Sequence, residues 1–316
     1  MYAAVTRIHK TTEVARKRAA SLSYVLFTSI LGFIALLFYN QAQAGINASL
    51  ELGLEYDSNV LSNNQLNNDY DSDFSNRLGI ALGGDYQWQN VMRIQGQYQY
   101  TQTRWLEASQ YDTDIHTGFL RISDRSGAWI REGIFLHAQA QIEGQDFLNL
   151  NRVSPALSVF ANKTWYLRTQ LDIGEKIFPQ YSNRDALFYG LKPSAYWLIN
   201  KMQHYVKLQL DISQENVDDK QYDQQSYSGK LSWNYKLDNT KITLETEIEE
   251  KQYNNPWSSI SDQRQDTRYK SKIKIQQNVS KHFTVKTEIG YDENQSNLAS
   301  SNYDQIRGLL KLKYEW

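Results

Sequence analysis

The sequence predicts an all-β protein, a transmembrane antiparallel β-barrel of about fourteen strands. Three observations predict it: apolar and polar side chains alternate along most of the chain, short and long connections interleave, and aromatic residues gather at both ends of the alternating segments. Alternation with a period of two is the pattern of β-strands. An even number of strands, joined by short periplasmic turns and longer extracellular loops, is typical of bacterial outer-membrane barrels.

The N-terminal residues 1–44 predict a cleaved secretory signal peptide. Five basic side chains precede a short apolar segment at residues 22–38, and Ala42 and Ala44 form the small-x-small pair of a cleavage site. The alternative is a retained membrane anchor, because the apolar segment is close to the lower length limit of a spanning helix. We therefore expect residues 45–316 to form the barrel.

Composition narrows the function classes. Without the five Lys/Arg and one Glu of the leader, the totals of 34 basic and 35 acidic residues become 29 and 34, a net charge of −5. This balance gives no support to nucleic-acid binding, which usually requires a basic patch. The sequence contains no Cys, so an exported protein must be stable without disulfides. No second segment is apolar enough for a membrane helix, which leaves a soluble exported protein or a closed barrel.

Alternation favours the barrel, because it continues almost without a break after the leader. We expect these side chains to point outward: Leu50, Leu52, Leu54, Leu78, Ile80, Leu82, Ile94, Tyr98, Tyr100, Ile134, Leu136, Ala138, Leu167, Leu171, Ile173, Leu208, Leu210, Ile212, Leu244, Ile248, Val285 and Ile289. The intervening positions are mostly polar and are expected to face a polar lumen. A soluble sandwich or propeller is the alternative, but its aromatic residues would collect in one core.

The connections form two interleaved sets. Six are tight turns, at residues 89–90, 123–127, 162–164, 199–202, 237–240 and 278–282. Seven are longer and rich in Asn, Asp, Ser and Gln, at residues 58–72, 106–112, 144–151, 178–186, 214–225, 252–266 and 293–302. Strict interleaving of six turns with seven loops implies about fourteen strands. The first strand then begins, and the last strand ends, on the short-turn side.

Aromatic residues mark the two ends of the strands. Those expected at the turn ends are Trp88, Trp165, Trp197, Trp233, Tyr235, Phe283, Tyr314 and Trp316. Those expected near the loop ends are Tyr56, Tyr100, Trp105, Tyr189, Tyr227, Tyr269 and Tyr291. Two belts of amphipathic rings at two depths are typical of the two interfaces of a membrane.

The inward positions contain candidate selectivity residues. Four arginines are expected to line the lumen and set its ion preference: Arg77, Arg93, Arg131 and Arg168. Charged rings along a pore wall select ions by their field. These side chains are therefore the candidates for solute selection.

A cross-strand charge ladder is predicted around the 252–266 loop. Glu245, Glu247 and Glu249 precede the loop, and Lys270, Lys272 and Lys274 follow it. The expected pairs are Glu249 with Lys270, Glu247 with Lys272 and Glu245 with Lys274. Each pair would contribute on the order of 0.2–1 kcal/mol. The ladder is interpreted as mutual neutralisation that sets strand register, in preference to an eyelet with a transverse field.

The C-terminal segment ends in an alternating strand. Leu310, Leu312, Tyr314 and Trp316 point one way, which resembles the C-terminal signal that barrel-insertion machinery reads in outer-membrane barrels. That resemblance implies the barrel assembly machinery and periplasmic chaperones as partners. The last strand is expected to close against the first, because an open edge in lipid leaves backbone groups unpaired.

Enzymatic function is not indicated. Residues 45–316 contain four His: His116, His137, His204 and His282. None lies in a nucleophile or metal motif, and no Cys is present, so no catalytic residue, metal ligand or cofactor site is predicted.

One stretch resembles a known family. LELGLEYDSNVLSNN, followed by DYDSDFSNRLGIALG, is similar to an outer-membrane β-barrel porin group that includes exopolysaccharide-associated barrels. The barrel of the surface lipoprotein assembly modifiers looks similar. The residues that carry the match are Tyr56, Asp57, Ser58, Asn59, Val60, Ser72 and Asp73. The resemblance implies a barrel of about fourteen strands and, as partners, exopolysaccharide or envelope export components.

The function expected from the sequence is a passive channel or export pore for polar solutes or polysaccharide in the outer membrane of a Gram-negative bacterium. Outer-membrane lipid and lipopolysaccharide would surround it. Two alternatives stay open: a surface-exposed interaction barrel with a plugged lumen, and a barrel that assists delivery of surface lipoproteins.

Overall fold

The computed structural model describes residues 44–60, 72–89, 91–200 and 202–316. Within these ranges, fourteen antiparallel strands close into one barrel, each paired with its chain neighbours and β1 paired with β14. The strands are β1 (Ala44–Asp57), β2 (Asp73–Trp88), β3 (Met92–Trp105), β4 (Thr113–Asp124), β5 (Trp129–Ile142), β6 (Gln145–Phe160), β7 (Trp165–Ile177), β8 (Ala186–Asn200), β9 (His204–Val217), β10 (Gln224–Leu237), β11 (Thr240–Trp257), β12 (Asp262–Asn278), β13 (Phe283–Ser296) and β14 (Tyr303–Glu315). The predicted fold class and strand number are confirmed.

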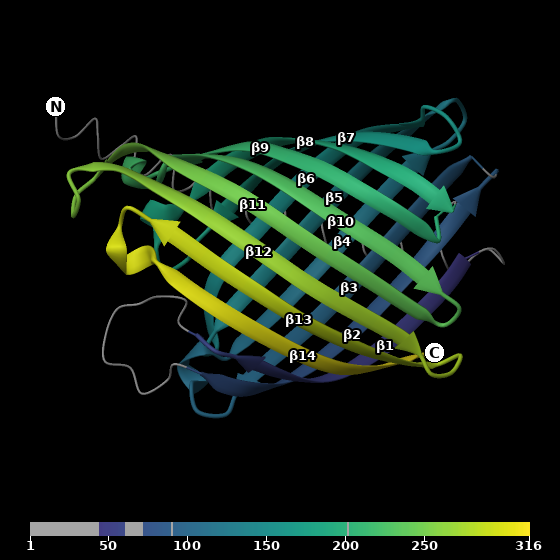
Figure 1. Cartoon of the computed structure of the whole chain (residues 1–316), viewed down its shortest axis with the longest axis horizontal. Coiled ribbons are helices and arrows are strands. Elements are labelled where there is room, and N and C mark those ends of the chain that lie inside the picture. Colours follow the sequence, from purple (N-terminus) through teal and green to yellow (C-terminus); the bar gives the residue numbers. More distant parts are fainter. Residues whose placement is uncertain (1–43, 61–71, 90, 201) are drawn as a thin grey trace. The chain divides into compact units, whose positions relative to one another are not determined.

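The strands run side by side and tilted, with short turns at one end of the barrel (right in Figure 1) and longer connections at the other (left). Each of the six predicted tight turns falls at a short connection between two consecutive described strands. The last strand ends on the short-turn side, where the first begins (Figure 1). The predicted signal peptide lies outside the described residues except for Ala44, and it stays a prediction. No helix in the described ranges is long and apolar enough to span a membrane.

The predicted long loop at residues 144–151 is wrong. β5 and β6 are joined there by the two residues Glu143 and Gly144, and the rest of the segment belongs to β6. Both turn residues have positive φ, 51° and 72°, which is the backbone of a tight hairpin turn whose twist matches the strands. Asn149 and Asn151 suggested a loop, but they are strand residues.

Most other loops are shorter than expected, because the strands extend past the predicted boundaries. Residues 214–217 belong to β9, and residues 252–257 and 262–266 belong to β11 and β12. In these extensions the outward face becomes polar, as at Gln214 and Gln265. A strand that extends beyond the apolar band is therefore polar on both faces, as a loop is, and the sequence pattern does not distinguish the two.

Four of the longer connections share one construction. Each contains a single turn of 3₁₀-helix: Ser109–Tyr111, Ser182–Arg184, Lys220–Tyr222 and Ala299–Ser301. An Asp or Asn follows each turn, and its side-chain oxygen accepts the N–H at or just after the end of the preceding strand. The pairs are Asp112 with Trp105 (2.8 Å), Asp185 with Phe178 (2.7 Å), Asp223 with Val217 (2.5 Å) and Asn302 with Ser296 (2.5 Å). These side chains hold the connections close to the barrel rim.

Burial is inverted relative to a water-soluble protein. In the described ranges the buried hydrophobic residues are few and mostly small: Ala108, Ala156, Ala186, Leu198 and Val217. The largest fully buried side chains are instead polar: Gln305, Asp57, Ser75, Ser154 and Ser158. Large apolar side chains are exposed on the outside, as at Leu54 (57%) and Ile289 (59%). An apolar exterior around a polar interior is the arrangement of a transmembrane barrel.

The first and last strands complete the barrel. Leu50 lies opposite Tyr314 and Leu52 opposite Leu312, so apolar residues of both strands share the outer face. The Trp316 N–H donates to the Ala48 carbonyl at 3.1 Å, which extends the pairing to the end of the chain. The sheet of the fourteen described strands therefore closes on itself, as lipid requires.

Candidate functional site: the barrel lumen

A buried carboxylate organises the charges on the inner wall of strands β4 to β7. Glu132 of β5 is paired with both Arg121 of β4 and Arg168 of β7, and its side chain is 2% exposed. Arg168 also lies 3.4 Å from the hydroxyl of Ser158, on the strand between β5 and β7. Strands β4 to β7 therefore place one carboxylate between two guanidinium groups on the inner wall.

A second group of charges continues the network around the wall. Asp172 of β7 is 3% exposed and lies 3.1 Å from Lys192 Nζ of β8 and 3.9 Å from Arg152 of β6. Lys192 in turn lies 2.7 Å from Asp211 of β9. We call these seven residues the mid-barrel cluster: Arg121, Glu132, Arg152, Arg168, Asp172, Lys192 and Asp211. Gln170 of β7 joins the two groups of ion pairs, because its side chain accepts from Arg168 at 3.0 Å and donates to Asp172 at 2.7 Å.

The charge ladder on β11 and β12 exists, but the predicted register is wrong. Glu247 lies opposite Lys270 and Glu245 opposite Lys272, two residues away from the expected pairing. The hairpin tip has the expected register, with Pro256 opposite Gln263. An irregularity between Gln252 and Pro256 then adds two residues to β11 and shifts every pair below it.

Long side chains restore two of the three expected ion pairs along diagonals. Lys270 Nζ lies 3.4 Å from Glu249, and Lys274 Nζ lies 2.9 Å from Glu245. Lys272 instead pairs with Glu288 of β13, at 3.5 Å. The ladder therefore extends across three strands, and charges on this wall largely neutralise one another, as the preferred interpretation expected.

Three of the four candidate arginines face the lumen, each next to a carboxylate. Arg77 Nη1 donates to Glu55 Oε2 at 2.7 Å, and Arg93 lies 3.1 Å from Asp85. Arg168 belongs to the mid-barrel cluster. Among the three, Arg93 is the most exposed, with 38% of its side chain accessible.

The predicted lumen position of Arg131 is wrong. Its neighbour Glu132 points inward, so Arg131 points outward, near the short-turn end of β5. It is 61% exposed and lies 3.1 Å from Asp124. A long cationic side chain near a membrane interface can extend to the water, which lowers the cost of this position.

The whole of β5 faces the opposite way from the expectation. Ile134, Leu136 and Ala138 were expected outside, but they share the inner face with Glu132. Both faces of β5 carry apolar side chains, so alternation alone does not distinguish them. The ion pairs of Glu132 decide the orientation, because a carboxylate facing hydrocarbon is far costlier than leucine facing water.

One part of the inner wall is consequently apolar. Leu136 lies opposite Phe119 of β4, and Ala138 lies opposite Leu150 of β6. We call these residues, with Ile134 and Leu148, the inner apolar patch. In the closed ring of fourteen strands, β5 is opposite β12, so this patch faces the wall that carries the charge ladder.

The sequence interpretation missed an aromatic row near the short-turn end of the lumen. Phe160 of β6, Tyr166 of β7 and Tyr196 of β8 are consecutive partners across the sheet. Their ring centres are 4.8 Å and 5.3 Å apart, and Tyr205 of β9 lies 5.9 Å from Tyr196. We call these four residues the aromatic row. The signal was present, because Trp165-Tyr166 and Tyr196-Trp197 are adjacent aromatic pairs, and one member of each must face inward.

The four His form structural contacts. His116 bonds with the Tyr98 hydroxyl at 2.7 Å, and His204 Nε2 accepts the Trp233 indole N–H at 2.8 Å. His137 bonds with Asn151, and His282 with a backbone carbonyl, each at 2.8 Å. In the part of the chain that the structure describes, no three His, Asp or Glu side chains are grouped to hold a metal ion.

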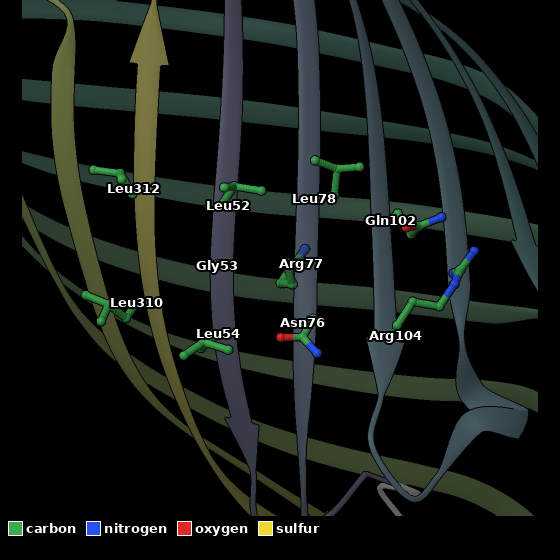
Figure 2. Close-up of a pocket in the computed structure, with 10 residues that line it drawn as sticks. All are labelled: Leu52, Gly53, Leu54, Asn76, Arg77, Leu78, Gln102, Arg104, Leu310 and Leu312. Atoms are coloured by element: carbon green, nitrogen blue, oxygen red, sulfur yellow. The ribbon is translucent and has the colours of Figure 1, made fainter.

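The outer wall at the seam between β14, β1 and β2 is apolar. Leu52, Leu54, Leu78, Leu310 and Leu312 line a shallow groove of about 520 Å³. Figure 2 shows these leucines on three neighbouring strands, with Gln102 and Arg104 following on β3. A leucine surface of this kind is suited to lipid chains.

Leu310 and Leu312 of the predicted insertion signal thus lie on the lipid face, and Trp316 is 64% exposed at the short-turn end.

Comparison with solved structures agrees with this architecture. The fold is that of an outer-membrane porin barrel. The in-vitro folded OmpT of Vibrio cholerae is similar with a TM-score of 0.51 and 8% identity, over 86% of this chain and 97% of that one. An anion-selective porin from Comamonas acidovorans is similar with a TM-score of 0.51 and 7% identity, over 86% and 99%. No protein-family model and no curated protein matches the sequence.

Proposed function

We propose that the protein is a passive channel of the outer membrane for small polar solutes. The observation that carries this proposal is the inner wall, which is lined with charged and polar side chains within a closed barrel whose exterior is apolar. Water wets such a wall, and small hydrated solutes can exchange hydrogen bonds with it. The porin fold of the similar structures supports the same function.

Charge selectivity should be modest. Most lumen charges are ion-paired, so the field along the axis is much weaker than the number of charged residues suggests. Arg93, being the most accessible of the inward candidate arginines, should contribute most of the three to ion preference. Passive transport requires no catalytic residue, and none is proposed.

Polysaccharide export is the larger-solute form of the same function, and the resemblance to exopolysaccharide-associated barrels supports it. A barrel with a plugged lumen, acting through surface contacts or in lipoprotein delivery, is the second candidate. The mid-barrel cluster favours it, because the side chains of Glu132 and Asp172 are only 2% and 3% exposed. In either case the C-terminal residues Leu310 to Trp316 serve as the proposed insertion signal.

Solute entry into liposomes tests the proposal. Purified protein is reconstituted into vesicles, and swelling is followed with a monosaccharide, a disaccharide and a dextran. A passive channel for small solutes gives rapid swelling with the monosaccharide, slower swelling with the disaccharide and none with dextran. Dextran entry would support polysaccharide export. Vesicles that exclude all three solutes would overturn the channel and favour the plugged barrel.

A further inference from the structure

The aromatic row ends on a lysine. Lys207 of β9 lies directly opposite Tyr196 in the sheet, and its ammonium nitrogen is 5.4 Å from the centre of that ring. Phe160, Tyr166, Tyr196 and Lys207 therefore follow one another across four neighbouring strands on the inner face. Three rings in succession and one ammonium group form a continuous surface close to the short-turn mouth of the lumen.

Lys207 is different from the lumen cations around it. Lys192 and Arg168 belong to the mid-barrel cluster, and Lys230 of β10 lies 3.7 Å from Glu247. Within the described ranges, Lys207 lies within ion-pair distance of no carboxylate, and its ammonium donates to the Gln209 amide oxygen at 2.7 Å.

The residues opposite Lys207 on the two neighbouring strands explain why it has no carboxylate partner. Its cross-strand partners on the inner face are Tyr196 of β8 and Ser232 of β10, neither of which is charged. A lysine ammonium has three donors, so donors remain after the bond to Gln209. A negatively charged group of a solute can accept from them.

We propose that the aromatic row and Lys207 form a binding site for an aromatic carboxylate on the solute path. The carboxylate would accept from Lys207, and the ring of the solute would pack on Tyr166 and Tyr196. Charge-assisted hydrogen bonds are stronger than neutral ones, and ring contacts at the spacings of this row are favourable. The proposal deepens the channel function and rests on it, since a permeating solute must reach the row from the lumen.

The inner apolar patch supports the same solute class. It lies nearer the loop end of the lumen and faces the charge ladder, so the channel offers apolar surface at one end and aromatic surface at the other. Between them lies the mid-barrel cluster. A solute with one apolar face and one charged group can use both kinds of surface, whereas a fully hydrophilic solute uses only the charged one.

The competing explanation is structural. Lys207 and Tyr196 form a cation–π contact, which can stabilise the folded barrel without any ligand. The two explanations differ in what a Lys207→Gln variant does. If the contact is purely structural, Lys207→Gln lowers the stability of the barrel and leaves solute binding unchanged.

Equilibrium binding and conductance, measured separately, test the proposal. Isothermal titration of the detergent-solubilised protein uses benzoate, acetate and benzyl alcohol as probes. We expect benzoate to bind, and the other two to bind at least about tenfold more weakly. Acetate has no ring to pack on the tyrosines, and benzyl alcohol has no carboxylate to accept from Lys207. Lys207→Gln should weaken benzoate binding about tenfold, as expected for loss of a charge-assisted bond.

Lys236→Gln is the matched control. Lys236 lies on the inner side of β10 near the same turn end, without a ring contact in the described part of the chain, and its removal should leave benzoate binding unchanged. Equal binding of acetate or benzyl alcohol, or benzoate binding that survives Lys207→Gln, would overturn the site. If the barrel conducts chloride but does not bind benzoate, the binding site is overturned and the channel function stands. If the barrel conducts no ions, the channel function is overturned whatever the binding result.

Discussion

At the scale of single residues, the lumen is governed by the cost of leaving a charge unpaired. Glu132 is almost fully enclosed and interacts with two arginines, so its loss leaves Arg121 and Arg168 close together without a counter-charge. Removing one partner of a buried ion pair is strongly destabilising, because the remaining charge keeps its desolvation penalty. The stability of the barrel should therefore be more sensitive to Glu132 than to exposed lumen carboxylates.

A Glu132→Gln substitution should lower the free energy of unfolding by about 3 kcal/mol. The measurement is urea unfolding in lipid vesicles, followed by tryptophan fluorescence. Glu288→Gln is the control, since the Glu288 side chain is 34% exposed and pairs with Lys272 at 3.5 Å. It should cost less than about 1 kcal/mol. Equal losses in the two variants would contradict the role assigned to burial.

Arg93 points into the lumen and Arg131 points outward, so the two arginines should differ in their effect on ion selectivity. Arg93→Gln removes a positive charge from the lumen and leaves Asp85, so the channel should become more cation-selective. Arg131→Gln makes the same chemical change on the outer face and should leave selectivity unchanged. Reversal potentials across a salt gradient measure both. A shift with Arg131→Gln would contradict the outward direction of this side chain on β5, and no shift with Arg93→Gln would contradict the place of Arg93 on the solute path.

At the scale of elements, β7 and β8 approach each other through a glycine. A Cβ added at Gly174 of β7 would clash with the Asn151 carbonyl oxygen of β6 and would lie 2.6 Å from the Phe188 ring of β8. The aromatic ring of Phe188 covers the glycine on the inner face, and the Lys176 ammonium lies 5.6 Å from the ring centre. Close packing of a ring over a strand glycine is a known stabilising feature of sheets.

Gly174→Ala should therefore destabilise the barrel by about 2 kcal/mol, the usual cost of forcing extra volume into a filled site. Gly133→Ala in β5 is the matched control, because a Cβ there meets nothing within 4 Å. It should be close to neutral. Thermal unfolding, read from the heat-modifiable shift in gel mobility, compares the two. A neutral Gly174→Ala would mean that β7 and β8 are less tightly packed than the structure indicates.

The connections at the loop end depend on their Asp and Asn side chains. Asp223→Ala removes the acceptor of the Val217 N–H and should weaken the connection between β9 and β10 by about 1 kcal/mol. Faster amide hydrogen exchange at residues 217–223, with unchanged exchange in the barrel strands, is the expected result. Asp262→Ala is the control, since that exposed carboxylate accepts the N–H of the next residue. Unchanged exchange in Asp223→Ala would contradict the role of this side chain.

Period-two alternation predicted the strands well, but it predicted register and facing less well, for separate physical reasons. Fourteen strands and six turns follow from alternation, because only one face of each strand contacts lipid. The irregularity between Gln252 and Pro256 is not visible in the alternation, so the charge ladder was predicted two residues out of register. Strand β5 has apolar side chains on both faces, and its orientation depends on Glu132, Arg121 and Arg168 meeting in space.

At the scale of the whole molecule, the barrel combines an apolar exterior with an interior that differs from wall to wall. The inner apolar patch lies on β4 to β6, the aromatic row on β6 to β9, and the charge ladder on β11 to β13. Polar inward positions were predictable from alternation. The division into walls was not, because it depends on how inward residues of neighbouring strands come together after closure.

The central claim is that this lumen conducts, and single-channel recording tests it most directly. The purified protein is inserted into a planar lipid bilayer in potassium chloride. The predicted result is steady conductance steps with weak ion selectivity, as expected for a wet lumen whose charges are mostly paired. Protein that inserts as a folded, heat-modifiable barrel and yet gives no steps at any voltage would contradict the claim. The function would then lie in the outer surface and the loops.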